Sequence, residues 1–280
     1  MKLSFRAIFL VTLLAPSALP WGPTGHRVVA EVAQRHLTPP VREKIKKILG
    51  GRTLADVANW PDELRTDRRF DKYKRLHFAT VPDGTASYAA APKDACGDLV
   101  VAIDAFRAFL RTGSRDSLYS VKALTDKSDG TAKGACNPQE TEPLNADTSL
   151  RFLVHLMGDL HQPLHVGGKD LGGNTVSVTW LDRWKTNLHA TWDDEMVDFE
   201  RLGYTEYAAF IDHAPDPSAL QQGSTLNWAD EDVTVRPKLY VLPAGNKISY
   251  DYIGQQRDLM RSQLLKGGLR LASVLNTIFQ

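Results

Sequence analysis

Histidine is concentrated in a few short segments of this 280-residue chain. Six of the eight histidines lie in WGPTGH, LHF, HLMGDLHQPLH and NLHATWD, close to glycine, tryptophan and aspartate, and all of these except His161 are candidate ligands. A single histidine is often a core side chain hydrogen-bonded to a backbone carbonyl, but that interpretation does not explain such a cluster. Imidazole nitrogens and carboxylate oxygens are common zinc ligands, so these segments predict a metal site. The five candidate ligands are His26, His77, His155, His165 and His189.

Two of these histidines precede an aspartate by four residues. His155 is followed by Asp159, and His189 by Asp193. Residues four apart share one face of a helix, so each pair can direct an imidazole and a carboxylate at the same ion. The spacing alone is weak evidence, because such pairs also arise by chance. Its context adds support, since a proline soon after the first pair should end that helix and present the next histidine from a loop.

The elements that must position these side chains are mostly helices. Apolar residues at helical spacing, with proline or polar residues at the starts, predict four of them. The longest is expected to be interrupted at Gly267 and Gly268, and residues 174–181 alternate as a strand does. We therefore expect a mainly α fold, a single compact helical domain with a small β-hairpin. The predicted helices cover residues 24–36, 40–49, 148–160 and 252–278.

The first twenty residues have the layout of a secretory signal peptide. Lys2 and Arg6 precede an apolar run over residues 7–15, and small residues follow. A buried N-terminal helix is the alternative. The run is too short to span a bilayer, so we expect residues 1–20 to be removed and residues 21–280 to form a secreted or periplasmic protein without a membrane anchor.

Export also bears on the two cysteines. Cys96 and Cys136 each lie in a segment predicted to be a loop, residues 82–97 and residues 127–144. In an oxidising compartment they are expected to form a disulfide, with two unpaired thiols as the alternative. Neither has the spacing of a cysteine zinc site.

The charge balance limits how the protein could hold nucleic acid. The net charge is +1, and removing Lys2 and Arg6 with the signal would leave −1. A protein that binds nucleic acid through a basic surface is more positive than this. If the substrate is polyanionic, bound metal ions must supply much of the attraction.

The motifs together resemble the zinc-dependent single-strand-specific nucleases of the S1/P1 nuclease family. The resemblance rests on WG…GH at the start, WPDELR, LHF, LVHLMGDLHQPLH, GGN and NLHATWD. It extends to KGGLRLASVLN near the C-terminus, so it covers nearly all of the chain after the predicted signal. Within it, His165 has the ligand position, and we expect His161 to be either a neighbour of the metal centre or a surface residue.

The resemblance implies three zinc ions and nine ligand residues. Asp159 would bridge two of the ions, and Trp21 would contribute its free amine and its carbonyl. The third ion therefore depends on cleavage after Pro20, a poor residue for signal peptidase, whereas cleavage after Ala18 would leave Trp21 without a free amine. The three expected ligand sets are Asp62, His77, His155 and Asp159; His165, His189 and Asp193; and Trp21, His26 and Asp159.

The resemblance also implies the reaction. The family hydrolyses phosphodiester bonds of single-stranded DNA and RNA to 5′-phosphorylated products and removes 3′-phosphates from nucleotides. Asp62 is expected to orient or deprotonate the attacking water, and Arg65 to steady the phosphate, with a surface arginine as the alternative. Phe78 is expected to stack on a base unless it is a core aromatic. Thr80, where the family often has an aspartate that reads the base, and Asn187 are further substrate-binding candidates.

Two other functions fit parts of this pattern. A zinc-dependent phospholipase C would share the helical fold and three-metal site, but it usually carries glutamate where this chain has Asp193. A non-catalytic zinc-binding or nucleic-acid-binding protein is expected to lack a ligand or Arg65, and this chain lacks neither. We therefore expect a nuclease. We also expect the protein to be a monomer.

Overall fold

The computed structural model describes residues 21–124 and 144–280, except for the side chains of residues 68 and 69. Over these residues the chain is mainly helical, as the sequence predicts, with a few short strands. The predicted signal peptide, residues 1–20, lies outside the described residues, and so does Cys136. The disulfide between Cys136 and the buried Cys96 therefore stays a prediction.

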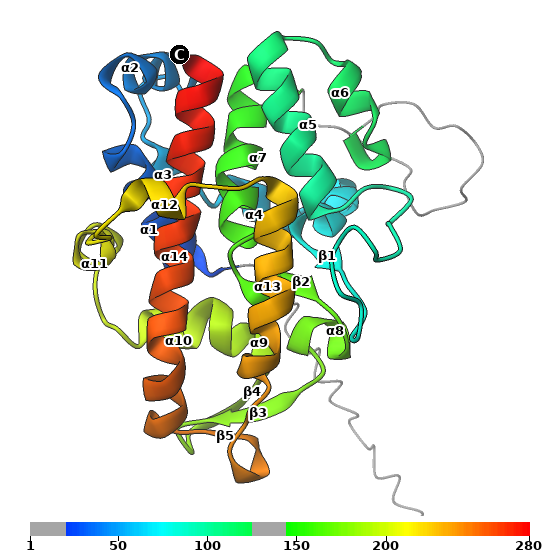
Figure 1. The fold of residues 1–280 in the computed structure, drawn as a ribbon, viewed down its shortest axis with the longest axis vertical. Helices are drawn as coiled ribbons and strands as arrows, with labels where there is room; N and C mark the ends of the chain where they lie inside the picture. Colours follow the sequence, from blue (N-terminus) through cyan, green and yellow to red (C-terminus); the bar gives the residue numbers. More distant parts are fainter. Residues whose placement is uncertain (1–20, 125–143) are drawn as a thin grey trace, which may run out of the picture.

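The longest helices of the described residues pack against one another along the long axis of the molecule (Figure 1). Their starts are stabilised locally, because side chains accept hydrogen bonds from first-turn N–H groups or a proline occupies the first turn. Asn145 forms a capping box at the start of α7, and Pro23 begins α1. None of the described helices is long and apolar enough to cross a bilayer. These five helices are α1 (Pro23–Arg35), α5 (Leu99–Thr112), α7 (Ala146–Asp159), α13 (Thr225–Leu239) and α14 (Tyr250–Phe279).

Shorter helical segments connect and flank this bundle, and several lie near the ends of α1 and α7. The α-helical ones are α2 (Pro39–Ile48), α3 (Leu54–Val57), α4 (Trp60–Glu63), α6 (Asp116–Tyr119), α8 (Asp170–Gly173), α9 (Leu188–Ala190), α10 (Met196–Asp198), α11 (Tyr204–Ile211) and α12 (Pro217–Leu220). The 3₁₀ turns are η1 (Leu64–Thr66), η2 (Arg68–His77), η3 (Lys122–Leu124), η4 (Pro163–His165) and η6 (Ala244–Asn246), and η5 (Thr191–Glu195) is a π-helical turn.

The strands form two small groups. β3 (Ser177–Trp180) and β4 (Trp184–Asn187) make the expected hairpin, and β5 (Lys247–Ile248) pairs parallel to β3. The observed β3 lies inside the strand predicted over residues 174–181. The second group, β1 (Ala79–Thr80) with β2 (Val166–Gly167), is parallel and joins two segments that carry site residues.

The predicted interruption of the last helix is wrong. α14 runs without a break through Gly267 and Gly268. The glycines serve packing instead, because a Cβ on Gly268 would lie 2.5 Å from the side chain of Val32 on α1, and one on Gly267 would lie 3.3–3.4 Å from His161 and Val29. The absence of side chains at these two positions lets α14 approach α1 closely, and tertiary packing compensates for the low helix propensity of glycine.

Candidate metal centre

The site residues predicted from the sequence converge at one end of α7. His155 and Asp159 lie on its last turns, and His26 approaches from α1. The approach depends on Gly158, where a Cβ would lie 2.7 Å from the Nδ1 atom of His26. Short elements bring the remaining residues: Asp62 from α4, His77 from η2, His165 from η4, His189 from α9 and Asp193 from η5.

The first group of donor atoms combines Asp62, His77, His155 and Asp159. The Nδ1 atom of His77 lies 3.0 Å from both the Asp159 Oδ2 and the His155 Nε2 atoms, and His155 Nε2 lies 3.3 Å from that oxygen. The Oδ1 atom of Asp62 is 3.8 Å from each of these nitrogens. Zinc–ligand bonds of about 2.0–2.1 Å place the corners of a tetrahedron about 3.4 Å apart, so the spacing suits one ion.

The second group consists of His165, His189 and Asp193. The Nε2 atom of His165 lies 3.6 Å from the Asp193 Oδ1 atom, and that of His189 lies 3.3 Å from Oδ2. The expected i, i+4 pair spans a π-helical turn, a local irregularity that is frequent at functional sites. Gln162 donates a 2.6 Å hydrogen bond to the Asp193 Oδ1 atom and fixes that carboxylate. Gln162 was not predicted from the sequence, although it lies inside the HQPLH motif.

Three of the histidines are oriented in the same way. Each Nδ1–H group donates a 2.7 Å hydrogen bond to a backbone carbonyl, which leaves Nε2 with its lone pair toward the cluster. Metal-binding histidines are commonly held by such a bond to the second ring nitrogen. The donors and acceptors are His155 with Ala58, His165 with His77, and His189 with Gly172.

His26 occupies a third position beside the Asp159 carboxylate. Its Nε2 atom lies 3.4 Å from the Asp159 Oδ1 atom, and its ring stacks on that of His155 with centroids 3.8 Å apart. The geometry also groups His26 with Asp62 and His155 as donors that could hold an ion. Trp21 is buried, and the N–H group of the adjacent Gly22 donates to the Asp193 carbonyl at 2.8 Å, so the start of the described chain lies against the turn that carries Asp193.

Several buried polar atoms in this cluster have no hydrogen-bond partner among the described residues. A buried polar atom without a partner is costly, and it is ordinarily satisfied by protein, water or an ion. Those that face the groups support metal binding, because they belong to imidazoles and carboxylates gathered at ligand spacing, whereas the Nε2 atom of His77 and the Nδ1 atom of His26 are on the other sides of their rings. The atoms without a partner are both ring nitrogens of His26, Nε2 of His77, Nε2 of His165, Oδ1 of Asp159 and Oδ2 of Asp193.

The protonation states of most of these groups favour metal binding. His155 differs: burial acts to lower its pKa, but the Asp159 and Asp62 carboxylates outweigh burial and raise that pKa. Burial lowers the pKa of His26 to about 4 and also lowers the pKa values of His165 and His189, so these rings are neutral at neutral pH. Burial acts to raise the pKa of Asp159, but the histidines around it outweigh burial and hold that pKa well below its ordinary value. Burial raises the pKa of Asp193 to about 7, and the nearby His189 offsets only part of this effect. Neutral imidazoles and ionised carboxylates are the forms that bind metal.

A cleft of about 580 Å³ opens beside the second group, and His77, His165 and His189 form part of its wall. All four other predicted functional residues of this region line it as well. They are Arg65, Phe78, Thr80 and Asn187.

The environments of these residues separate some of the alternatives raised by the sequence. Phe78 is 46% exposed and so is not a core aromatic. Arg65 donates a 3.1 Å hydrogen bond to Asp62 and is largely buried, so it is not a solvated surface arginine. The Asn187 side-chain oxygen accepts from Ala190 N–H and caps α9, which leaves its amide N–H groups for a ligand.

Other residues of the cleft were not singled out from the sequence. Leu171 and Asn174 belong to the turn that carries the GGN motif, and Lys74 lies on η2. Gly172 makes this turn possible, since its φ is +64° and a Cβ would collide with the Leu164 carbonyl. By contrast, His161 is buried away from the cluster and bonds to Met157 and Arg270, so the surface assignment is wrong.

The fold and the site define a mainly helical enzyme with three histidine–aspartate groups that could hold metal ions. Residues 21–280 match the family model described as S1/P1 Nuclease, and the chain belongs to this family of hydrolases. The predicted family is thereby confirmed.

Proteins similar to this chain include plant and fungal nucleases. Endonuclease 3 of Arabidopsis thaliana is 29% identical over 98% of this chain and 94% of its own length. Nuclease P1 of Penicillium citrinum is 28% identical over 92% of this chain and 97% of its own length. Nuclease S1 of Aspergillus oryzae is 32% identical over 69% of this chain and 60% of its own length. These relatives agree with the family match in placing the chain among nucleases.

Proposed function

We propose that this chain is a zinc-dependent endonuclease that hydrolyses single-stranded DNA and RNA to 5′-phosphorylated products and removes the phosphate of 3′-nucleotides. The observation that carries the proposal is the position of the open cleft directly against the histidine–aspartate groups. Three zinc ions would be held by the three ligand sets expected from the sequence, with Asp159 shared between two of them.

The donor chemistry favours zinc over magnesium. Five imidazoles are combined with three carboxylates, whereas magnesium prefers an all-oxygen octahedral shell. When bound, the zinc ions would lower the pKa of a water ligand and offset the charge of the phosphodiester, on a protein whose own net charge is close to zero.

The chain's own residues would orient substrate and water. Asp62 lies at the edge of the first group, where a carboxylate can accept a proton from water. The Arg65 guanidinium beside it can bind two oxygens of a phosphate, and its ion pair with Asp62 fixes its direction. The exposed ring of Phe78 offers a face for a nucleobase, and Thr80 and Asn187 supply polar contacts on the same cleft.

The same proposal covers processing and location. Removal of residues 1–20 would make Trp21 the mature N-terminus, place its amine beside His26, and release a monomer to the periplasm or the medium. Metal analysis and N-terminal sequencing of the exported protein test this part. Three zinc ions per chain and a Trp21 terminus are expected, while a mature terminus at Leu19 would contradict it.

Substrate comparison tests the reaction. The zinc-loaded protein is expected to cleave a single-stranded oligonucleotide much faster than the same sequence in a duplex, and to leave phosphatidylcholine intact. End analysis should find 5′-phosphate on the products, and 3′-AMP but not 5′-AMP should release phosphate. A chelator should abolish these activities and added zinc should restore them; activity that is indifferent to both would contradict the proposal.

A further inference from the structure

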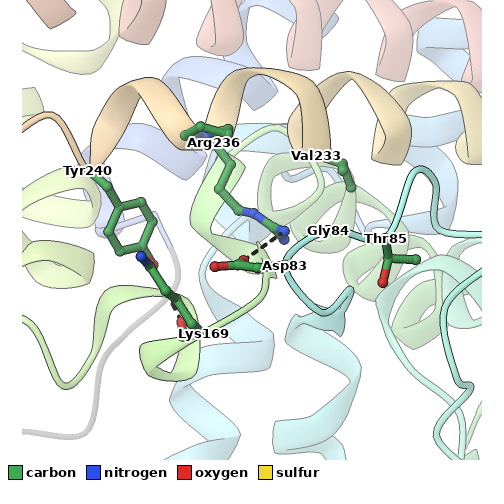
Figure 2. A pocket seen from close by; sticks show the side chains of 8 residues that line it. Asp83, Gly84, Thr85, Lys169, Val233, Arg236 and Tyr240 are labelled. Atoms are coloured by element: carbon green, nitrogen blue, oxygen red, sulfur yellow. Dashed lines mark hydrogen bonds and ion pairs between the residues drawn. The ribbon is translucent and has the colours of Figure 1, made fainter.

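A second hollow, the α13 pocket, lies between α13 and the loop that follows β1. It has a volume of about 330 Å³ and is lined in part by Asp83, Thr85, Lys169, Arg236 and Tyr240. Figure 2 shows Arg236 reaching from α13 to Asp83, with Tyr240 and Lys169 together on one side and Thr85 on the other. The metal-binding and catalytic residues proposed above do not line this pocket.

Gly168 lies between the cleft and two residues that line the α13 pocket. Gly168 lines the cleft, and a Cβ at this position would collide with Asp83 and lie 3.0 Å from the Arg236 guanidinium. The two cavities also share elements, because β1 places Thr80 in the cleft and continues into the loop that carries Asp83. A strand that leaves the cleft past Gly168 would therefore come close to Asp83 and Arg236 of the α13 pocket.

The floor of the α13 pocket is built from a buried ion pair. The Arg236 side chain is only 6% exposed; it donates to the Val166 carbonyl at 2.5 Å and to the Asp83 Oδ1 atom at 3.2 Å. This pairing fixes the loop against β2. Asp83 therefore offsets most of the charge of Arg236, and the floor is not a phosphate site by itself.

The wall of the α13 pocket offers a different kind of contact. The Tyr240 ring is half-buried, and the Lys169 ammonium lies 5.2 Å from its centroid. Burial raises the pKa of Tyr240 and the nearby Asp170 carboxylate adds to this shift, so Asp170 lies close enough to offset the charge of Lys169. A free anion would gain little here, whereas a planar base could stack on the aromatic face while its phosphate meets the ammonium.

We infer that the α13 pocket binds one nucleotide of a single strand, at a position beyond the nucleotides held in the cleft. The inference rests on the proposed nuclease function and adds a distal subsite to it. Tyr240 stacks on the base and Lys169 contacts its phosphate, while Arg236 and Asp83 position the loop. A pocket of this size accommodates a base with its sugar.

The test compares a long and a short substrate. A twelve-residue oligothymidylate can reach both cavities, whereas the dinucleotide thymidylyl-thymidine can occupy only the cleft. For Tyr240→Ala, the ratio of kcat/KM on the oligonucleotide to that on the dinucleotide is expected to fall about tenfold, mainly through KM, because one stacked base is lost. Tyr240→Phe keeps the ring and should keep the ratio. Lys169→Ala should lower the ratio less and flatten the salt dependence of KM on the oligonucleotide.

Matched controls come from the opposite end of the molecule (Figure 1). Tyr119→Ala on α6 and Lys47→Ala on α2 remove an exposed tyrosine and an exposed lysine, and both should leave the ratio unchanged. Equal losses on the two substrates in Tyr240→Ala, or no loss on either, would overturn the inference. If the unaltered protein cleaves neither substrate, the proposed function itself fails, and that result is distinguishable from failure of the subsite.

Discussion

Gln162 is placed to orient a proposed metal ligand without binding the metal itself. Its side-chain amide donates to the Asp193 Oδ1 atom, and its side-chain oxygen accepts from the Leu164 N–H at 2.7 Å. The side chain therefore couples the turn that presents His165 to the carboxylate of the same donor group. Its amide is buried, so this bond has no competition from bulk water.

Gln162→Ala is expected to weaken zinc binding at the second group by about 10- to 100-fold, the usual effect of removing a hydrogen bond to a ligand. Zinc retention against a graded series of chelator concentrations measures this. Activity at saturating zinc should recover most of the loss, because the ligands themselves are intact. Gln222→Ala, at an exposed glutamine far along the chain, is the control. Unchanged retention in Gln162→Ala would contradict the orienting role.

Substitutions at Arg65 test substrate binding independently of metal binding. Its guanidinium faces the cleft and bonds to Asp62. Arg65→Ala is expected to lower kcat/KM by about 10²- to 10³-fold, since a charged donor to the phosphate is lost. Arg65→Lys should recover only part of this, because an ammonium lacks the two-pronged geometry.

The matched control for that experiment is Arg111→Ala, which removes an exposed arginine from α5. Zinc content should equal that of the unaltered protein in every variant. A large loss of zinc from Arg65→Ala would mean that the arginine acts by holding Asp62 and not by contacting substrate.

At the scale of elements, the contact between α1 and α14 sets where His26 lies. Gly268→Ala is expected to destabilise the fold by about 1–3 kcal/mol, because the new methyl group overlaps Val32 and the helices must separate. Gly254→Ala, on the same helix with open space around it, should instead stabilise by up to about 1 kcal/mol. Denaturant unfolding of the zinc-loaded proteins measures both. Stabilisation by both substitutions would contradict the close contact between α1 and α14, because it would mean that these helices can move apart without cost.

This contact also shows what the sequence could and could not predict. Helix periodicity located α1 and α7 to within two residues, because their apolar faces are continuous. It could not predict that α14 continues through Gly267 and Gly268, because the reason lies in α1, more than 200 residues away. Likewise, the role of Gln162 depends on a carboxylate from another element, and single-sequence spacing carries no such information.

At the scale of the whole molecule, the centre draws its residues from segments spread between Trp21 and Asp193. The candidate metal ligands could be predicted from the histidine segments, because imidazoles and carboxylates grouped in this way are typical of metal sites. The cleft and the α13 pocket were not predictable, since their walls come from loops whose paths depend on tertiary packing.

Metal ions bound by the histidine–aspartate groups would hold α1, α7 and the short site helices to one another. Zinc should therefore stabilise the entire fold, with zinc removal lowering the Tm measured by calorimetry.

The pH dependence of zinc retention follows from the burial of the same histidines. Burial lowers the pKa of His26 to about 4, against about 6.5 in the unfolded chain. Between these values the folded protein keeps the imidazole neutral while the unfolded chain takes up a proton, so stability declines as pH falls from about 6.5 toward 4. Zinc content after dialysis should stay near its neutral value at pH 5.5 and fall steeply near pH 4, where protons compete for the ring. Re-addition of zinc at pH 7 should restore it. Full retention at pH 4, or complete loss already at pH 6, would contradict this account of the centre.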